Sequence, residues 1–306
     1  MSRESASELR SLKDRLPELT PEPGLYLVAT PLGNALDLGL RALQILSSVS
    51  RIAAEDTRVS QQLLTTYGIT KLLISYHSYN AEQRDPELVQ LIRGGESIAL
   101  ISDAGMPLIS DPGSSLVTAC VEAGLPVTVI PGPSAGITAL TASGLDASRY
   151  TFYGFLPKKR GRRKSVLEEL LASKETLIFY EAPQRIPDTL SDLAEIAPER
   201  RCVVARELTK TYETYYRGTT ASLAAELQAG VKGECMILLE GLLAYRERMP
   251  DTPASNEQTR QILRFSLDRG LSLRDSIDLL RLMDPAIDKN EVYELALAIK
   301  EGDSNG

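Results

Sequence analysis

Three turns rich in glycine and proline carry the residue types that most directly suggest a binding site in this 306-residue chain. They read TPLGN at 30–34, SDAGMPLISDPG at 102–113 and PGPSAG at 131–136. Each follows a short apolar run that predicts a β-strand, and open parallel sheets bind ligands beyond the carboxyl ends of their strands. A single turn of this kind could equally well serve only to reverse the chain, but three at equivalent strand ends predict one pocket. Because the sequence contains neither GxGxxG nor GxxxxGK[ST], this pocket differs from the usual dinucleotide and Walker-type sites.

The densest cluster of charge is the segment KKRGRRK at 158–164, with six positive charges in seven residues. It directly follows the aromatic stretch 152–155, whereas the whole chain has a net charge of -7 and no general attraction to polyanions. Lysine and arginine neutralise phosphates, and tyrosine or phenylalanine can stack on an unpaired base. We therefore predict a loop that binds RNA; a solvated, mobile loop is the alternative. The predicted RNA-binding residues are Lys158, Lys159, Arg160, Arg162, Arg163, Lys164, Arg185 and Arg206.

The scarcity of histidine and cysteine limits the chemistry of the chain. His77 is the one histidine, and a structural hydrogen-bonding role is favoured for it over a catalytic one. Cys120, Cys202 and Cys235 lie far apart in apolar runs, which is typical of reduced, buried thiols. No metal site is expected, because neither CxxC nor HxxxH spacing occurs. The N-terminus lacks a signal-peptide core and no apolar run approaches about 20 residues, so a cytoplasmic protein without membrane contact is expected.

An alternation of strand and helix patterns predicts an α/β protein with two α/β domains. Five strand-then-helix units at 24–147 predict a first domain with a mainly parallel sheet covered on both faces. The intervals then vary, and residues 148–243 predict a second α/β domain with a mixed sheet. Residues 244–256 are polar with two prolines and predict a linker, and 257–306 predict a small C-terminal helical segment. Residues 1–23 are an N-terminal extension.

A series of ordered motifs gives the chain a resemblance to a known family. In chain order they are LVATPLGNxxD, AAEDTR, LISDAGMPLISDPG, VIPGPSAGITAL, GFLP with basic residues after it, YEAPQR, and RELTK with RG and KGE downstream. Between about residue 24 and residue 240 this order resembles the bacterial ribosomal RNA small subunit methyltransferase I family, within the tetrapyrrole methylase fold. The resemblance implies an S-adenosylmethionine-dependent enzyme that methylates a cytidine ribose 2'-hydroxyl in the decoding region of 16S ribosomal RNA. It also implies a cofactor cleft between two α/β domains and a homodimer, with 16S ribosomal RNA, free or in the small ribosomal subunit, as the partner.

The resemblance also assigns residues to the cofactor, S-adenosyl-L-methionine, which leaves as S-adenosyl-L-homocysteine. The implied cofactor-binding residues are Pro31, Gly33, Asn34, Asp103, Ala104, Gly105, Met106, Ser134, Ala135, Tyr180, Ala205 and Glu234. One departure from the family pattern is Gln184, which stands where a histidine is common. If that histidine is the base in other members, the base of this chain lies elsewhere; otherwise the position only forms hydrogen bonds.

Methyl transfer to a ribose hydroxyl needs alignment of the acceptor with the methyl group and removal of one proton. Alignment can supply about 7 to 11 kcal/mol, and a general base adds about 10²- to 10⁴-fold. The catalytic candidates from the sequence are Glu181, Glu207 and Lys210. For Glu181 we weigh two interpretations, a carboxylate that orients the ribose and one that only pairs with Arg185 four residues on.

Three other functions are weighed against this one. A methylase of the same fold that acts on a corrin-type tetrapyrrole would need neither the basic segment nor the C-terminal helices. A non-catalytic RNA-binding assembly factor would not need the intact DAGMP and PGPSA turns. A nucleotide hydrolase would need a phosphate loop and metal-binding carboxylates, for which the sequence shows no pattern.

Overall fold

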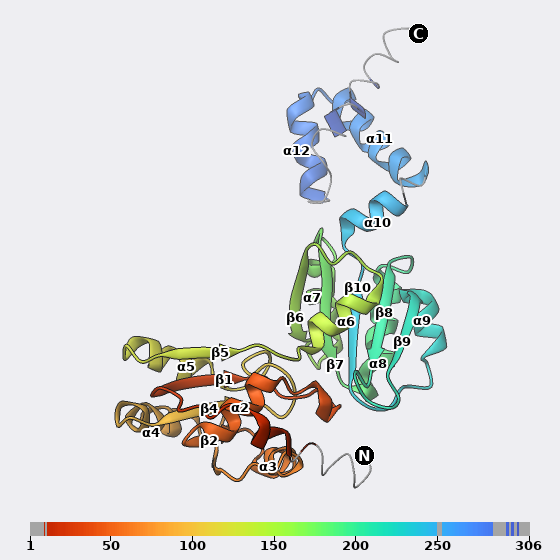
Figure 1. The fold of residues 1–306 in the computed structure, drawn as a ribbon. Helices are drawn as coiled ribbons and strands as arrows, with labels where there is room; N and C mark the ends of the chain where they lie inside the picture. The colour runs from red at the N-terminus through yellow and green to blue at the C-terminus, as the bar shows by residue number, and fades with distance from the viewer. Residues whose placement is uncertain are drawn as a thin grey trace. The chain divides into compact units, whose positions relative to one another are not determined.

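The chain forms two compact units, each built on a five-stranded sheet (Figure 1). The computed structural model describes Leu9, residues 11–249 and 253–283, and Val292, Tyr293, Leu295, Ala296 and Ile299. The first unit comprises Met1–Ala142 with Ala205–Tyr215 and Gly233–Met236, and the second comprises Ser143–Val204, Tyr216–Lys232 and Ile237–Gly306. The first unit thus includes two segments from the second half of the chain, which sequence order alone does not indicate.

The first sheet is parallel, as predicted, and both of its faces are covered. Its strands are β1 (Gly24–Val28), β2 (Arg51–Ala54), β3 (Leu72–Ser75), β4 (Ser97–Ile101) and β5 (Val127–Ile130), in the order β3-β2-β4-β1-β5. The helices that follow these strands along the chain are α2 (Leu40–Ser48), α3 (Thr57–Thr66), α4 (Ala81–Arg93), α5 (Ser114–Glu122) and α6 (Ala135–Ser143). Successive residues of a strand point to opposite faces, and Leu27 and Val28 of β1 belong to different buried clusters. One cluster includes α2 and α3 residues and the other includes α4 and α5 residues, so helices bury both faces.

The N-terminal extension packs on the first of these clusters. Leu9 is buried there, and Leu12 and Leu16 pack beside it around the short helix η1 (Lys13–Arg15). The Lys13 ammonium donates to the carbonyl of Gly68.

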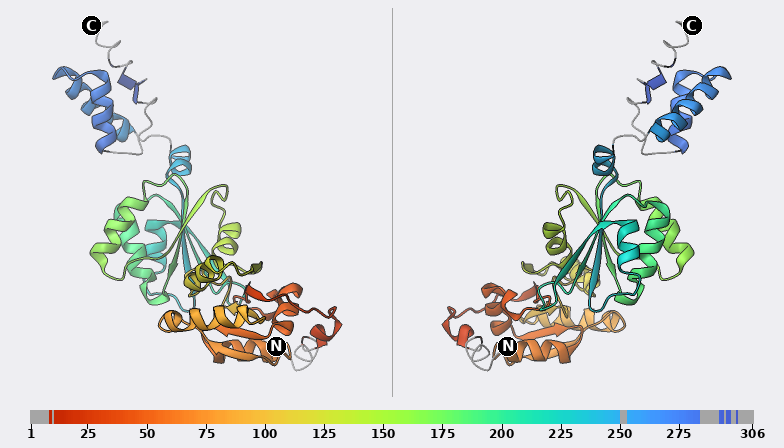
Figure 2. Two further views of the ribbon diagram at one scale, coloured as in Figure 1. Left: turned by 90° about the vertical axis from the view of Figure 1, so that its left-hand side faces the viewer. Right: turned by 90° about the vertical axis from the view of Figure 1, so that its right-hand side faces the viewer.

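The second sheet has strands β6 (Tyr150–Phe155), β7 (Thr176–Glu181), β8 (Arg201–Arg206), β9 (Thr214–Thr219) and β10 (Cys235–Leu239), in the order β6-β7-β10-β8-β9. Strands β6 and β7 run parallel and are joined through α7 (Arg160–Leu170), whereas β8 and β9 are neighbours joined without a helix. Helices α7, α8 (Ile186–Ile196) and α9 (Thr220–Glu226) cover one face of this sheet (Figure 2). The predicted α/β fold with a parallel and a mixed sheet is therefore confirmed.

Helices follow the second sheet, and the first of them begins before the predicted linker. Helix α10 spans Leu242–Arg248 and is held by Arg248, whose guanidinium pairs with Glu240 at 2.8 Å. Helices α11 (Pro253–Asp268) and α12 (Leu273–Met283) share a buried cluster that includes Leu263 and Ile277. Residues 250–252 of the predicted linker lie outside the described residues. Within the described part of the chain, no helix has the length and apolarity needed to cross a membrane.

Candidate active site

The loops that leave β1 and β4 meet at the carboxyl edge of the first sheet. Thr30 and Gly105 exchange backbone hydrogen bonds of 2.9 and 3.0 Å, and the Thr30 hydroxyl donates to the carbonyl of Ser102 at 3.1 Å. Strands β1 and β4 are neighbours, yet β1 leads to α2 on one face and β4 leads to α5 on the other. This divergence is the topological switch point at which open α/β sheets bind ligands.

The loop after β4 has an unusual backbone. Leu108 and Ser110 have φ angles of 75° and 71°, a left-handed conformation that is uncommon for residues with a Cβ. Such residues persist only where the surrounding structure holds them, and they concentrate at ligand sites. Asp103 and Ala104 are exposed in this loop, Met106 is half-buried and Gly105 is buried.

Three carboxyl groups gather at the ends of β2 and β4. Burial, followed by repulsion between the carboxylates, raises the pKa of Glu55; burial also raises the pKa of Asp103 and of Asp111. The backbone amide of Asp56 donates to Asp103 Oδ1 at 3.2 Å and joins the two loops. Sequence reasoning missed Glu55 and Asp111, although Glu55 lies in the quoted motif AAEDTR, directly after β2, and Asp111 lies in LISDAGMPLISDPG, in the loop after β4. In the described chain, no group of three histidine, cysteine or acidic residues has the arrangement of a metal site.

A second cluster forms where β8 ends, and it belongs to the first unit. The Lys210 ammonium contacts Glu207 Oε1 and Glu234 Oε2, both at 3.0 Å. Glu207 Oε1 also accepts from the backbone amide of Glu234 at 2.9 Å. Glu207 and Thr209 have φ angles of 51° and 63°, and the Thr209 hydroxyl accepts from the amide of Asn34 at 3.1 Å. The turn at 233–234 and the TPLGN turn are thus both fastened to the loop after β8.

Gly33 is required in this cluster because the Lys210 side chain lies directly on it. A Cβ at position 33 would come within 2.3 Å of Lys210 Cγ and 2.8 Å of its Cε. These atoms form the stem of a side chain whose ammonium is held at its other end, so the stem cannot move without breaking its ion pairs.

The electrostatics of this cluster argue against the predicted roles of Glu207 and Lys210 as bases. Hydrogen bonds from the Glu234 amide and from Lys210 lower the pKa of Glu207, which makes it a weaker proton acceptor. Burial alone would lower the pKa of Lys210, but its hydrogen bonds to two carboxylates outweigh burial and raise it. Lys210 therefore stays protonated at neutral pH and positions the loops around Gly33.

Glu181, the third catalytic candidate, is enclosed within the second unit. Its side chain is buried, and its Oε2 accepts from the Thr189 hydroxyl at 2.7 Å. Its Oε1 accepts from the amide of Ala182 and lies 3.2 Å from Arg185 Nε. Arg185 also donates to the carbonyls of Leu156 and Pro157. Of the two interpretations of Glu181, this geometry supports a structural carboxylate that pairs with Arg185. Glu181 holds the turn between β7 and α8.

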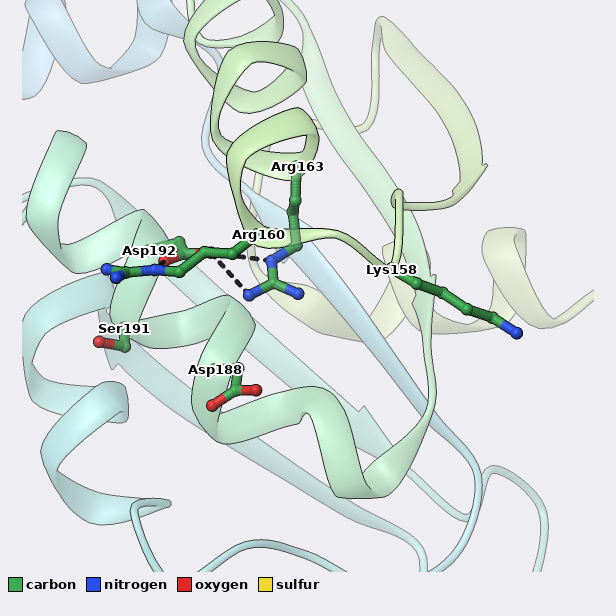
Figure 3. A pocket seen from close by; sticks show the side chains of 6 residues that line it. All are labelled: Lys158, Arg160, Arg163, Asp188, Ser191 and Asp192. Carbon is green, nitrogen blue, oxygen red and sulfur yellow. Dashed lines mark hydrogen bonds and ion pairs between the residues drawn. The ribbon is translucent and has the colours of Figure 1, made fainter.

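Most of the basic segment lies in a helix rather than in the predicted loop: α7 begins at Arg160, and only Lys158 and Lys159 precede it. Arg163 is buried, and its guanidinium lies 2.7 Å from Asp192 Oδ2, on α8. Arg160 pairs with the other oxygen of Asp192 at 2.8 Å, and Lys164 pairs with Glu195 at 2.7 Å. Figure 3 shows Arg163 directed toward Asp192 and Lys158 directed away from it. The assignment of Arg163 to RNA is therefore corrected: its charge is used inside the protein.

The other predicted residues divide between the two units. In the first unit, Pro31 and Ala205 are buried, Gly33, Asn34 and Glu234 are exposed, and Ser134, Ala135 and Arg206 are half-buried. Tyr180 is half-buried in the second unit, between the rings of Phe152 and Phe155. Gln184 is exposed in the short helix η3 (Pro183–Arg185). The Nδ1 atom of His77 has no hydrogen-bond partner among the described residues, and the His77 backbone amide donates to Asn80 Oδ1 at 2.9 Å.

Comparisons with known proteins identify the class to which this fold and these loops belong. The family model of tetrapyrrole (corrin/porphyrin) methylases matches residues 24–224. The fold is similar to that of uroporphyrin-III C-methyltransferase from Thermus thermophilus, solved with S-adenosyl homocysteine, with a TM-score of 0.51 and 18% identity over 71% of this chain and 97% of that chain.

Closer relatives narrow the class further. Ribosomal RNA small subunit methyltransferase I of Mesorhizobium japonicum is 48% identical over 72% of this chain and 76% of its own length. The protein of that name from Escherichia coli O157:H7 is 42% identical over 89% of this chain and 94% of its own length. The chain therefore belongs to the tetrapyrrole methylase family and, within it, to the ribosomal RNA small subunit methyltransferase I family.

Proposed function

We propose that this chain is an S-adenosylmethionine-dependent methyltransferase that acts on the 2'-hydroxyl of a cytidine ribose in the decoding region of 16S ribosomal RNA. The observation that carries the proposal is 42% identity along 94% of a relative named for methylation of small-subunit ribosomal RNA. The proposed setting is the cytoplasm, and the proposed assembly is a homodimer, which light scattering on the purified protein tests.

The loops of the first unit fit the proposed cofactor. They lie at the switch point of a parallel sheet, are fastened by the Thr30–Gly105 bridge, and expose Asp103 and Ala104. The residues that would hold it are Asp103, Ala104 and Met106 after β4, with Ser134 and Ala135 at the start of α6. When bound, S-adenosylmethionine supplies a methyl group already activated on a sulfonium. The chain itself must therefore orient the acceptor hydroxyl and accept its proton.

We assign Asp103 as the group that accepts the proton of the acceptor hydroxyl. Of the three carboxyl groups with a raised pKa, Asp103 is exposed, whereas Glu55 and Asp111 are half-buried. A raised pKa brings a carboxylate closer to the value that suits a general base near neutral pH. The Asp56 amide that donates to Asp103 Oδ1 leaves Oδ2 for an acceptor hydroxyl.

The RNA-binding surface that we propose consists of Lys158, Lys159 and Arg162. All three are exposed, and the described contacts give none of them an acidic partner, unlike Arg160, Arg163 and Lys164. Three phosphate contacts would give a slope of log affinity against log salt of about -2 on single-stranded RNA, at roughly -0.7 per contact.

The first experiment measures transfer of labelled methyl groups to small ribosomal subunits from cells that lack this gene. Nuclease digestion and mass spectrometry then locate the product. Label on the 2'-oxygen of a decoding-region cytidine supports the proposal. Cofactor binding without label on RNA would refute the acceptor and favour a small-molecule methylase.

A second experiment tests the surface. The variant Lys158→Glu/Lys159→Glu/Arg162→Glu should lose most of its RNA affinity and its salt dependence while its affinity for S-adenosyl homocysteine is unchanged. The matched control, Arg41→Glu/Arg93→Glu with Lys174→Glu, makes the same change in net charge at other exposed positions. Equal RNA affinity in the two variants would refute the proposed surface.

A further inference from the structure

The edge strand of the second sheet contains an irregularity next to its aromatic residues. Strand β6 lies at one edge of the sheet, where β7 is its one neighbour among the described strands. In the register of this pair, Phe152 lies opposite Ile178, Gly154 opposite Phe179 and Phe155 opposite Tyr180. The register shifts between Phe152 and Gly154, which makes a β-bulge with one additional residue on β6.

The bulge places two phenylalanine rings on one face of the sheet. In a regular strand, side chains three residues apart point to opposite faces. Here the added residue lets both Phe152 and Phe155 contact Tyr180, with ring centroids 5.1 and 5.3 Å from that of Tyr180. Gly154 has a φ of 83°, which glycine adopts without steric cost. The arrangement of the three rings is therefore set by the backbone and not by a flexible loop.

One ring of this cluster is open to an incoming ligand. Phe155 is 57% exposed, although its ring is held against Tyr180 and the residue belongs to a paired strand. A large aromatic ring fixed in this way loses little conformational freedom when a second ring stacks on it. Lys158 and Lys159 follow within four residues, and both are exposed. Aromatic rings beside cations that neutralise the backbone are the two elements of single-strand nucleic acid binding surfaces.

We infer that Phe155 is a stacking site for an unpaired base of the RNA substrate. This inference rests on the proposed function and adds that the RNA is single-stranded where it contacts Phe155. The base must be unpaired, because a base in a duplex is already stacked on both of its faces. An RNA base fits better than the adenine of the cofactor, because adjacent cations neutralise phosphates and S-adenosylmethionine has none.

The absence of tryptophan from the chain provides a direct test. Phe155→Trp keeps an aromatic ring at the site and makes it the one tryptophan of the protein. We expect a short single-stranded oligocytidylate to quench its fluorescence, and an RNA duplex of the same length to quench it much less. In the control variant Tyr79→Trp, at a side chain that is 96% exposed in the first unit, the same oligonucleotide should have little effect. S-adenosyl homocysteine titrated alone should leave the Phe155→Trp signal unchanged.

A binding measurement separates stacking from charge. Phe155→Ala should weaken oligocytidylate binding by about 5- to 150-fold, with the salt slope and S-adenosyl homocysteine affinity unchanged, whereas Phe155→Tyr should bind like the wild type. The inference is overturned if Phe155→Ala binds as well as the wild type while the triple glutamate variant still loses binding. It is also overturned if S-adenosyl homocysteine alone quenches Phe155→Trp, because the ring would then face the cofactor. Failure of the wild-type protein to bind or methylate any RNA would instead refute the proposed function.

Discussion

Replacement of Arg163 by methionine should destabilise the protein strongly without removing an RNA contact. The side chains of Arg163 and Asp192 are 4% and 1% exposed, and the Arg163 Nε lies 2.8 Å from Asp192 Oδ2. Removing one partner of a buried ion pair leaves an uncompensated charge and typically costs about 3 to 5 kcal/mol. Arg160 still contacts Asp192 Oδ1, but its side chain is 65% exposed, so we expect Arg163→Met to cost about 3 kcal/mol, at the lower end of this range.

Urea unfolding followed by circular dichroism measures this loss. The control Arg162→Met, one residue earlier and exposed, should change the free energy of unfolding by no more than about 0.5 kcal/mol. The double variant Arg163→Met/Asp192→Leu should recover more than half of the loss, because it removes both charges together. Wild-type stability of Arg163→Met combined with weaker RNA binding would refute this reasoning and return Arg163 to the RNA surface.

Three further predictions follow from the contacts described above. Gly33→Ala should cost about 1 to 3 kcal/mol in urea unfolding by forcing the Lys210 stem aside, and Lys210→Ala in the same chain should relieve most of that cost; simple addition of the two effects would contradict the contact. Burial alone would raise the pKa of Glu240, but hydrogen bonds from Arg248 and the Arg201 amide outweigh burial and lower it. Glu240 therefore stabilises the fold above about pH 4.3, and this stabilisation is lost as pH falls through the pKa of the folded state. The urea midpoint of Glu240→Gln should therefore fall less steeply with acidification than that of the wild type, and parallel curves would exclude this source of pH dependence. Asp103→Asn should lower kcat by about 10²- to 10⁴-fold and abolish the fall of kcat at acidic pH. If kcat of this variant still falls at acidic pH, another residue is the general base.

The fold was accessible from the sequence because its signals are local. Five apolar runs each followed by a helix-period stretch specify a parallel sheet, and turns at the strand ends mark the edge where Thr30 and Gly105 meet. The contacts between distant segments were not accessible in this way. The Lys210 stem lies on Gly33, which is far away in the sequence, and no local pattern in RELTK predicts this contact. The bulge at Gly154 likewise depends on the register with β7, which the letters FYGF do not specify.

The basic segment shows how a local pattern can be recognised and its use still be misjudged. Read as a loop, KKRGRRK offers all of its charges to one ligand, but as the start of α7 it has a helical period. Residues three and four apart share a helix face, so Arg160, Arg163 and Lys164 all turn toward Asp192 and Glu195 of α8. Arg162 lies about 200° around the helix from Arg160 and is exposed, as are Lys158 and Lys159 before the helix. The same seven residues thus fasten α7 to α8 with one set of cations, and the second set, Lys158, Lys159 and Arg162, is the one that we propose for RNA. Because the first set fixes α7, which carries Arg162 and directly follows Lys158 and Lys159, loss of the ion pairs to α8 should weaken RNA binding indirectly and together with stability. Variants of the second set should weaken RNA binding at unchanged stability.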